Sequence, residues 1–148
     1  MSDTANLEDF RKESSFKNEK EFQKYLVLNA DYWITDFFGG PGTLEEQHYF
    51  GLKYFGSNKP RIDLVIKMED GSKIGVEVKN PIQCFAELSR SVSQILAYAI
   101  LEEDFSSEFD QLALITSRFD PIVIKIIKKF ELPIRLFVVN KDVHCEIK

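Results

Sequence analysis

The chain has 148 residues, of which 44% are hydrophobic, and its 19 basic and 24 acidic side chains give a formal net charge of -5. This length suits one compact domain, and the apolar fraction is too high for a disordered chain. No apolar run approaches the roughly 20 residues of a membrane helix, and the two cysteines are too few for a disulfide framework or a metal cluster. Zinc fingers, collagen, coiled coils and disulfide-rich secreted scaffolds are therefore excluded, and we expect a cytoplasmic, intracellular protein with no membrane partner.

The first third of the chain predicts helices followed by a strand. We expect residues 1–15 to form a flexible acidic leader and residues 16–148 to form a single domain. Apolar residues three and four positions apart predict an amphipathic helix or a helix pair over Asn18–Phe38, which ends at the Gly-Gly-Pro-Gly sequence of 39–42. The aromatic-rich segment His48–Phe55 predicts the first strand.

Two alternating segments predict a β-hairpin. Arg61–Met68 and Lys73–Lys79 alternate between apolar and polar residues and are joined by Glu69-Asp70-Gly71. A three-residue loop with a left-handed Gly71 predicts cross-strand pairs that complete one apolar face: Met68 with Ser72, Ile66 with Ile74, Leu64 with Val76, and Ile62 with Val78. On the opposite face the same register places Asp63 across from Glu77, with Lys79 two residues further along.

The second half of the chain predicts alternating helices and strands. A long helix is expected over Cys84–Glu103, and the apolar run Leu112–Thr116 is typical of a buried central strand. Asp120 followed by Pro121 predicts the start of a helix that extends to about Phe130. Strands over Ile134–Val139 and Val143–Ile147 complete an α/β fold with a mixed sheet.

The opposed carboxylates of Asp63 and Glu77 indicate a metal site. Two acids facing each other on a sheet repel unless a cation lies between them. Mg²⁺ or Mn²⁺ prefers oxygen ligands, so two carboxylates and a backbone carbonyl, that of Val78, are suitable. With Lys79 beside them, these residue types suit metal-assisted hydrolysis of a phosphodiester, while a solvated polar strand face is the alternative interpretation.

The same residues resemble the PD-(D/E)XK nuclease superfamily. In that pattern an Asp opens one strand and Glu-x-Lys lies on the next, as in Arg61-Ile62-Asp63-Leu64-Val65 and Gly75-Val76-Glu77-Val78-Lys79; Pro60 departs from it because it stands three residues before Asp63. A second Glu-x-Lys, Glu146-Ile147-Lys148, lacks a paired upstream Asp and a following helix. The resemblance implies a restriction-endonuclease-like αβββαβ core, a central mixed β-sheet flanked by helices, with an added helix and C-terminal strands.

A second motif on the predicted long helix narrows the resemblance. Gln94-Ile95-Leu96-Ala97-Tyr98 is similar to the Gln-x-x-x-Tyr motif of RecB-type members, and Ser91, Gln94 and Tyr98 share one flank of the helix. The resemblance implies that Gln94 and Tyr98 contact substrate phosphate or steady the catalytic lysine. Ser91 and Arg61 are further candidate substrate contacts, and an ordinary surface charge is the alternative for Arg61.

The resemblance also implies a glutamate from the opening helix, which completes the metal site in many members. Two candidates compete: Glu19 lies roughly 50–60° from the apolar stripe of that helix and Glu21 about 110° from it, so we favour Glu19. The resemblance spans about Asn18 to Val139. The chain resembles both the nuclease domains of archaeal mismatch endonucleases and the N-terminal nuclease of type I restriction motor subunits. The sequence does not distinguish between these two subfamilies.

The resulting hypothesis is a Mg²⁺- or Mn²⁺-dependent DNA endonuclease with Asp63, Glu77, Lys79 and Glu19 as catalytic residues. Residues 51–79 and 111–148 carry more basic than acidic side chains, which suits a polyanionic partner although the whole chain is acidic. The His48–Phe55 strand can serve as a homodimer edge. The alternatives are a catalytically silent nuclease-fold DNA-binding module and a subunit of a larger restriction or repair assembly. No role is predicted for His144.

Overall fold

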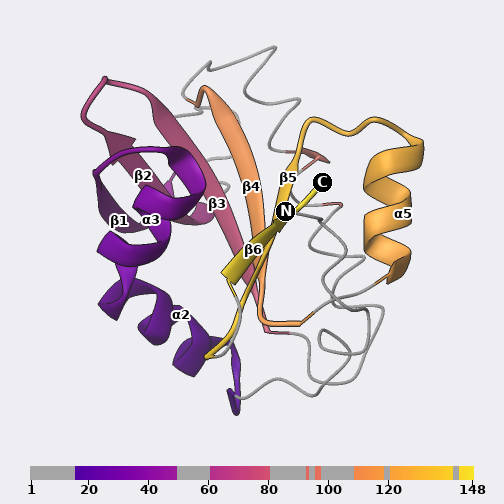
Figure 1. The fold of residues 1–148 in the computed structure, drawn as a ribbon, viewed down its shortest axis with the longest axis horizontal. Coiled ribbons are helices and arrows are strands. Elements are labelled where there is room, and N and C mark those ends of the chain that lie inside the picture. The colour runs from indigo at the N-terminus through magenta and orange to yellow at the C-terminus, as the bar shows by residue number, and fades with distance from the viewer. Residues whose placement is uncertain are drawn as a thin grey trace.

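The computed structural model describes residues 16–49, 61–80, 93, 96–97, 109–118, 121–141 and 144–148. These residues form one six-stranded mixed sheet with helices on its faces, which confirms the predicted α/β class (Figure 1). The leader of residues 1–15 lies outside the described residues, and the extent of the domain stays a prediction. No helix in the described part of the chain is long and apolar enough to cross a membrane.

The predicted opening helix is a helix pair, α2 (Glu19–Leu28) and α3 (Ala30–Phe38). The Asn18 side chain caps α2 by accepting the backbone N–H of Glu21 at 2.8 Å, which satisfies a donor that the helix itself leaves unpaired. The pair ends where predicted, because Gly39 adopts a left-handed backbone with φ of 77° after the last turn of α3.

The sheet combines an antiparallel meander with a parallel half. Its strands follow chain order from one edge to the other: β1 (Gly42–Tyr49), β2 (Arg61–Met68), β3 (Lys73–Lys79), β4 (Gln111–Thr116), β5 (Arg135–Val139) and β6 (His144–Ile147). The pairs β3–β4 and β4–β5 are parallel, and the other three pairs are antiparallel. β2 and β3 have the predicted bounds, and β4, β5 and β6 begin within one residue of theirs.

The first strand differs from the prediction of His48–Phe55. It begins six residues earlier, at Gly42, and the residues beyond Tyr49 lie outside the described part. The part of β1 that the prediction missed is mainly polar. Only Leu44 of this part packs against the described core, whereas Glu45 is exposed and forms an ion pair with Lys67 of β2 at 3.4 Å. Because backbone hydrogen bonds with β2 hold this edge strand, it does not need the aromatic residues on which the prediction relied.

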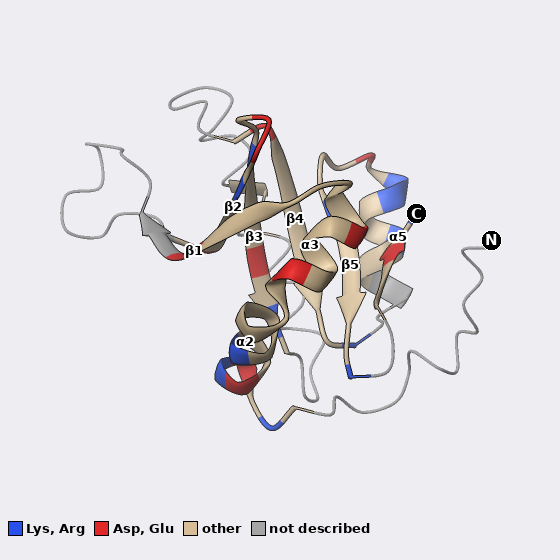
Figure 2. Cartoon of the chain, turned by 60° about the vertical axis from the view of Figure 1, so that its left-hand side comes forward, with Lys and Arg blue, Asp and Glu red and all other residues tan. Residues whose placement is uncertain are grey.

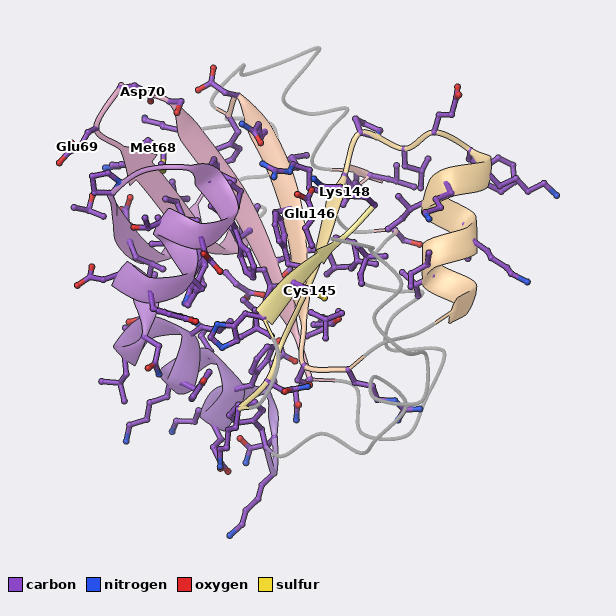
Figure 3. The ribbon with its side chains drawn as sticks, in the orientation of Figure 1. Met68, Glu69, Asp70, Cys145, Glu146 and Lys148 are labelled. Carbon is purple, nitrogen blue, oxygen red and sulfur yellow. The ribbon has the colours of Figure 1, made fainter. Side chains whose placement is uncertain are left out.

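The hairpin register is confirmed over most of its length. Leu64 pairs with Val76 and Ile66 with Ile74, and the Met68 N–H donates to the Ser72 carbonyl at 2.9 Å. Gly71 is left-handed with φ of 92°, as the predicted loop requires. The labelled Met68 and Asp70 mark this turn at the tip of the hairpin in Figure 3.

Ile62 does not lie on the predicted face. The described β2–β3 pairing stops at Leu64, and Ile62 packs with Val65 and Leu112 on the opposite side of the sheet from Leu64. The alternation of β2 side chains between the two faces of the sheet is therefore interrupted around Asp63. At this point the Asp63 side chain, and not the backbone, is hydrogen-bonded to β3. Gly75 leaves the space that Ile62 fills, because a Cβ there would lie only 2.8 Å from Ile62 Cδ1.

Two apolar layers cover the sheet. On one face α2 and α3 bury Phe22, Leu26, Trp33 and Ile34 against Leu64, Ile66, Ile74, Val76 and Val78. On the other face α5 (Pro121–Lys129) buries Val123 and Ile124 against β4 and β5. Figure 1 shows α2 and α3 in front of β1–β3, with α5 beside β5. Of the predicted helix Cys84–Glu103, the described residues Ser93, Leu96 and Ala97 are helical, and the rest lies outside the described residues.

We expect Gly75→Ala to lower the free energy of unfolding by about 1–3 kcal/mol, because the new methyl group overpacks against Ile62 and Leu112. Urea denaturation measures this change. Gly40→Ala is the matched control, since its Cβ meets nothing closer than Met68 Cε at 3.9 Å and should change stability by less than about 0.5 kcal/mol. Equal stability of Gly75→Ala and wild type would contradict the packing of Ile62 described here.

Candidate functional site

Asp63 of β2 reaches across to β3 with its carboxylate. Its Oδ2 accepts the backbone N–H of Val78 at 2.9 Å, in the stretch where the described main-chain pairing of the two strands has ended. A carboxylate that accepts a backbone N–H is held in one orientation. This bond fixes the Asp63 side chain beside the end of β3 that carries Glu77 and Lys79.

Glu77 is the buried acid of the site. Only 4% of the residue is exposed, and its Oε2 is buried without a hydrogen-bond partner among the described residues. Burial, together with the hydrogen bond and the negative charge of Asp63, raises the pKa of Glu77 to about 10; Lys79 acts in the opposite direction and Glu19 adds to the increase. Without a cation, the acid pair therefore carries a proton at neutral pH.

Glu19 and Lys79 meet at the same end of β3. The Lys79 Nζ lies 3.7 Å from Oε2 of Glu19, on the first turn of α2. Figure 2 shows charged residues of both signs on this turn. Glu21, the competing candidate, points elsewhere: it accepts the backbone N–H of Lys17 at 3.3 Å. The structure thus brings Glu19, and not Glu21, to Asp63, Glu77 and Lys79.

Buried polar residues that the sequence analysis did not single out support this end of the sheet. Asn80 directly follows β3 and Ser117 directly follows β4; the Ser117 hydroxyl donates to the Asn80 side chain, and its N–H donates to the Lys79 carbonyl at 3.3 Å. The Asn80 amide donates to the Phe16 carbonyl at 3.2 Å. The sequence signal that could have identified Asn80 and Ser117 is a polar residue directly after each of two apolar runs. Neighbouring parallel strands end at the same edge of a sheet, so such residues lie close together.

The remaining predicted site residues are not placed. Ser91, Gln94 and Tyr98 lie outside the described residues, and Arg61 is described only through its backbone in β2. Their contacts with substrate stay predictions.

The second Glu-x-Lys sequence is structural. Glu146 of β6 forms two 2.8 Å contacts with Arg135 of the neighbouring strand β5, through Nε and Nη2. Figure 3 labels Glu146 and Lys148 at this end of the chain. The Glu146 carboxylate is occupied by an arginine, in contrast to that of Glu77.

The residues present fit a divalent cation. Glu77 offers a buried oxygen with no described partner, and Asp63 offers a second carboxylate that its bond to Val78 already orients. No group of three or more His, Cys, Asp and Glu side chains suited to a metal occurs in the described residues. Two carboxylates would therefore need a backbone carbonyl and waters to complete the shell, which is the way Mg²⁺ is usually held.

Comparisons with known proteins give weak similarities. No family model matches the chain, and no curated protein matches it significantly. Among solved structures, the chain is similar to a repair endonuclease from Pyrococcus abyssi at 13% identity and a TM-score of 0.48, covering 87% of this chain and 50% of that one. EndoMS in its apo form (15% identity, TM-score 0.48, 86% and 49% covered) and an EndoMS–dsDNA complex (17%, 0.48, 90% and 49%) are similar to the same degree. The chain spans about half the length of these structures.

We expect the metal-free protein to lose stability relative to Glu77→Gln as the pH rises. The folded protein keeps the Glu77 proton up to its raised pKa of about 10, whereas the unfolded chain releases it above about 4.5, so the stability that this group contributes is full below pH 4.5 and falls as the pH approaches 10. Urea denaturation in EDTA at pH 5.5 and 8.5 should show that the free energy of unfolding of wild type, measured relative to that of Glu77→Gln, falls by about 1–4 kcal/mol between the two pH values. Exposed Glu69→Gln is the control, and a difference between wild type and Glu77→Gln that does not change with pH would contradict the raised pKa.

Proposed function

We propose that this chain is a divalent-metal-dependent DNA endonuclease that hydrolyses phosphodiester bonds. The observation that carries the proposal is the buried carboxyl of Glu77 beside Asp63: burial first, and then Asp63, raises its pKa to about 10, and one of its oxygens has no hydrogen bond among the described residues. Such an arrangement is costly for a fold that uses it only as structure. A cation that replaces the proton would remove this cost.

The cation would be held by Asp63, Glu77 and the Val78 carbonyl. Once bound, Mg²⁺ or Mn²⁺ would neutralise charge on the scissile phosphate and acidify an attacking water. Asp63 contributes a carboxylate already fixed by its bond with the Val78 N–H, so little orientation is lost on binding. Glu77 contributes the buried oxygen.

Lys79 supplies the positive charge on the protein side of the reaction. Its ammonium is largely buried beside the carboxyl pair and can orient the attacking water and offset the negative charge that develops on the phosphate. Glu19 positions Lys79 through the 3.7 Å ion pair between α2 and β3. The hydrogen bonds of Ser117 and Asn80 hold the chain that follows Lys79.

DNA is the proposed partner, with Arg61, Ser91, Gln94 and Tyr98 as expected contacts. The net charge of -5 means that any attraction for phosphate must come from local groups rather than from the whole molecule. A homodimer through the His48–Phe55 segment also stays a prediction, since most of that segment lies outside the described residues.

Purified protein should cleave DNA with Mg²⁺ or Mn²⁺ and stop in EDTA. Asp63→Asn and Glu77→Gln remove metal ligands and should abolish cleavage, and Lys79→Ala should slow it about 10²–10⁴-fold. Lys148→Ala in the second Glu-x-Lys sequence is the matched control and should cleave normally. DNA binding without metal-dependent cleavage by wild type would identify a silent binding module instead, and full activity of Asp63→Asn would contradict the site.

The two glutamates of the first turn of α2 should differ in effect. Glu19→Gln removes the partner of the Lys79 ammonium and should reduce the cleavage rate about 10–100-fold. Glu21→Gln leaves that ion pair intact and should keep the rate within about twofold of wild type. Single-turnover cleavage rates, with circular dichroism as the check of folding, measure both; a larger loss in Glu21→Gln than in Glu19→Gln would contradict the assignment.

A further inference from the structure

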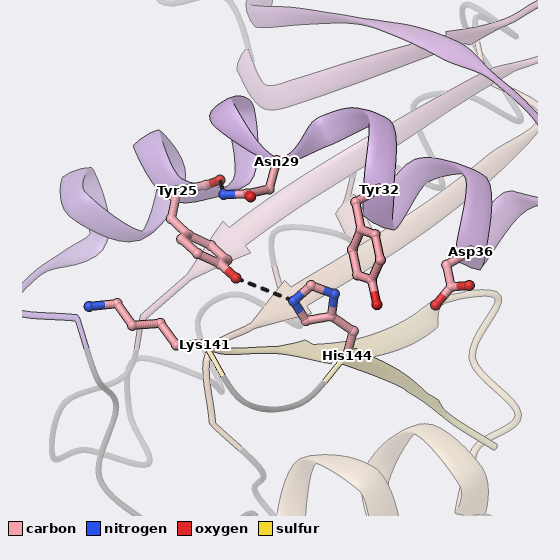
Figure 4. Close-up of a pocket in the computed structure, with 6 residues that line it drawn as sticks. All are labelled: Tyr25, Asn29, Tyr32, Asp36, Lys141 and His144. Atoms are coloured by element: carbon pink, nitrogen blue, oxygen red, sulfur yellow. Dashed lines mark hydrogen bonds between the residues drawn. The ribbon is translucent and has the colours of Figure 1, made fainter.

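A pocket lies between the α2–α3 pair and strand β6, outside the candidate active site. It has a volume of about 400 Å³, and its lining is Tyr25, Asn29, Tyr32, Asp36, Lys141 and His144 (Figure 4). Pockets of this size take one small ligand of about the size of a nucleotide. Aromatic and charged side chains make up nearly the whole lining, which indicates a ligand that is both planar and ionic.

Three rings form the wall of the pocket. Tyr32 packs edge-on against His144 with ring centroids 5.0 Å apart, and 65% of Tyr32 remains exposed. The Tyr25 hydroxyl lies 3.4 Å from Nε2 of His144. Burial lowers the pKa of His144, against the smaller opposing effects of the Asp36 charge and the Asn140 backbone, so the imidazole is held towards its neutral form. An exposed tyrosine ring beside a neutral imidazole is a surface on which a planar base stacks.

The charges of the pocket lie at opposite ends. Figure 4 shows Lys141 on the side of Tyr25 and Asp36 on the side of Tyr32. Helix α3 also carries Asp31, and it contains no basic residue, so a phosphate is disfavoured at the Asp36 end. A nucleotide would therefore lie with its phosphate at Lys141 and with the N–H donors of its base towards the Asp36 carboxylate.

The Lys141 end is the one that connects to the candidate active site. The Lys141 Nζ lies 5.4 Å from the centre of the Phe16 ring, and the Phe16 carbonyl accepts the side-chain amide of Asn80, the residue after Lys79. Glu19 and Tyr25 are six residues apart on α2, a rise of about 9 Å. The Lys141 end of the pocket and the candidate active site are therefore linked through Phe16 and Asn80.

We propose that this pocket binds one nucleotide of an unpaired DNA strand, with its base stacked on the exposed Tyr32 ring beside His144 and its phosphate at Lys141. A base offers its ring face and its Watson–Crick edge together only when it is unpaired. The inference rests on the proposed function, because it names the substrate class: DNA with an unpaired segment next to the cut. The Asp36 carboxylate is placed to accept an N–H donor from the edge of the base.

Binding to the 148-residue chain in EDTA tests the proposal without cleavage. Fluorescence anisotropy should show tighter binding of a labelled single-stranded oligonucleotide than of a duplex of equal length. Tyr32→Ala and Lys141→Ala should each weaken single-strand binding about tenfold, and Tyr32→Phe should retain it. Leu28→Ala, on an exposed residue that does not line the pocket, and Lys128→Ala, on the exposed side of α5, are matched controls that should bind as wild type.

The outcomes separate this pocket from the active site. Unchanged single-strand binding in Tyr32→Ala, or equal affinity of wild type for duplex and single strand, would overturn the proposal. A free mononucleotide that competes as strongly as the oligonucleotide would overturn the assignment to a strand. Tyr32-dependent binding in a protein that never cleaves would support the pocket while contradicting the proposed function, and cleavage without Tyr32-dependent binding would do the reverse.

Discussion

The hydrogen bond from the Val78 N–H to the Asp63 carboxylate is the contact on which the candidate site depends. It joins two strands where their described main-chain pairing has stopped, and it holds one acid beside another that is buried. The raised pKa of Glu77 follows first from the loss of water around it and then from this proximity of Asp63. In the described part of the sheet the two carboxyl groups therefore lie together at one end of β3, where the proposed cation would bind.

Much of the hairpin and of its acid pair could be predicted because the relevant signals are local. The alternation of β2 and β3 and the glycine of their loop determine the register as far as Leu64, and the adjacent residue of β2, Asp63, is held to β3 by its bond with the Val78 N–H. The choice of Glu19 over Glu21 followed from helix geometry in the same way, and the ion pair with Lys79 agrees with it.

What the sequence could not supply depends on contacts between distant segments. Ile62 changes face because Gly75 leaves space on the other side of the sheet, where Ile62 packs against Leu112, a fact absent from the alternation of β2 itself. The early start of β1 depends on backbone bonds to β2. His144, for which no role was predicted, meets Tyr25 across 119 positions of the chain, and only the folded sheet brings the two together.

The parallel pairing of β3 with β4 has a consequence for how the protein assembles. Ile74 pairs with Gln111, so these distant segments must come together before the edge that carries Lys79 and Ser117 exists. Such long-range pairing raises the contact order and slows folding. A nascent chain that ends before β4 would contain the hairpin with its two acids but would lack the strand whose Leu114 pairs with Glu77, so the candidate site would be complete only after the second half of the polypeptide is made.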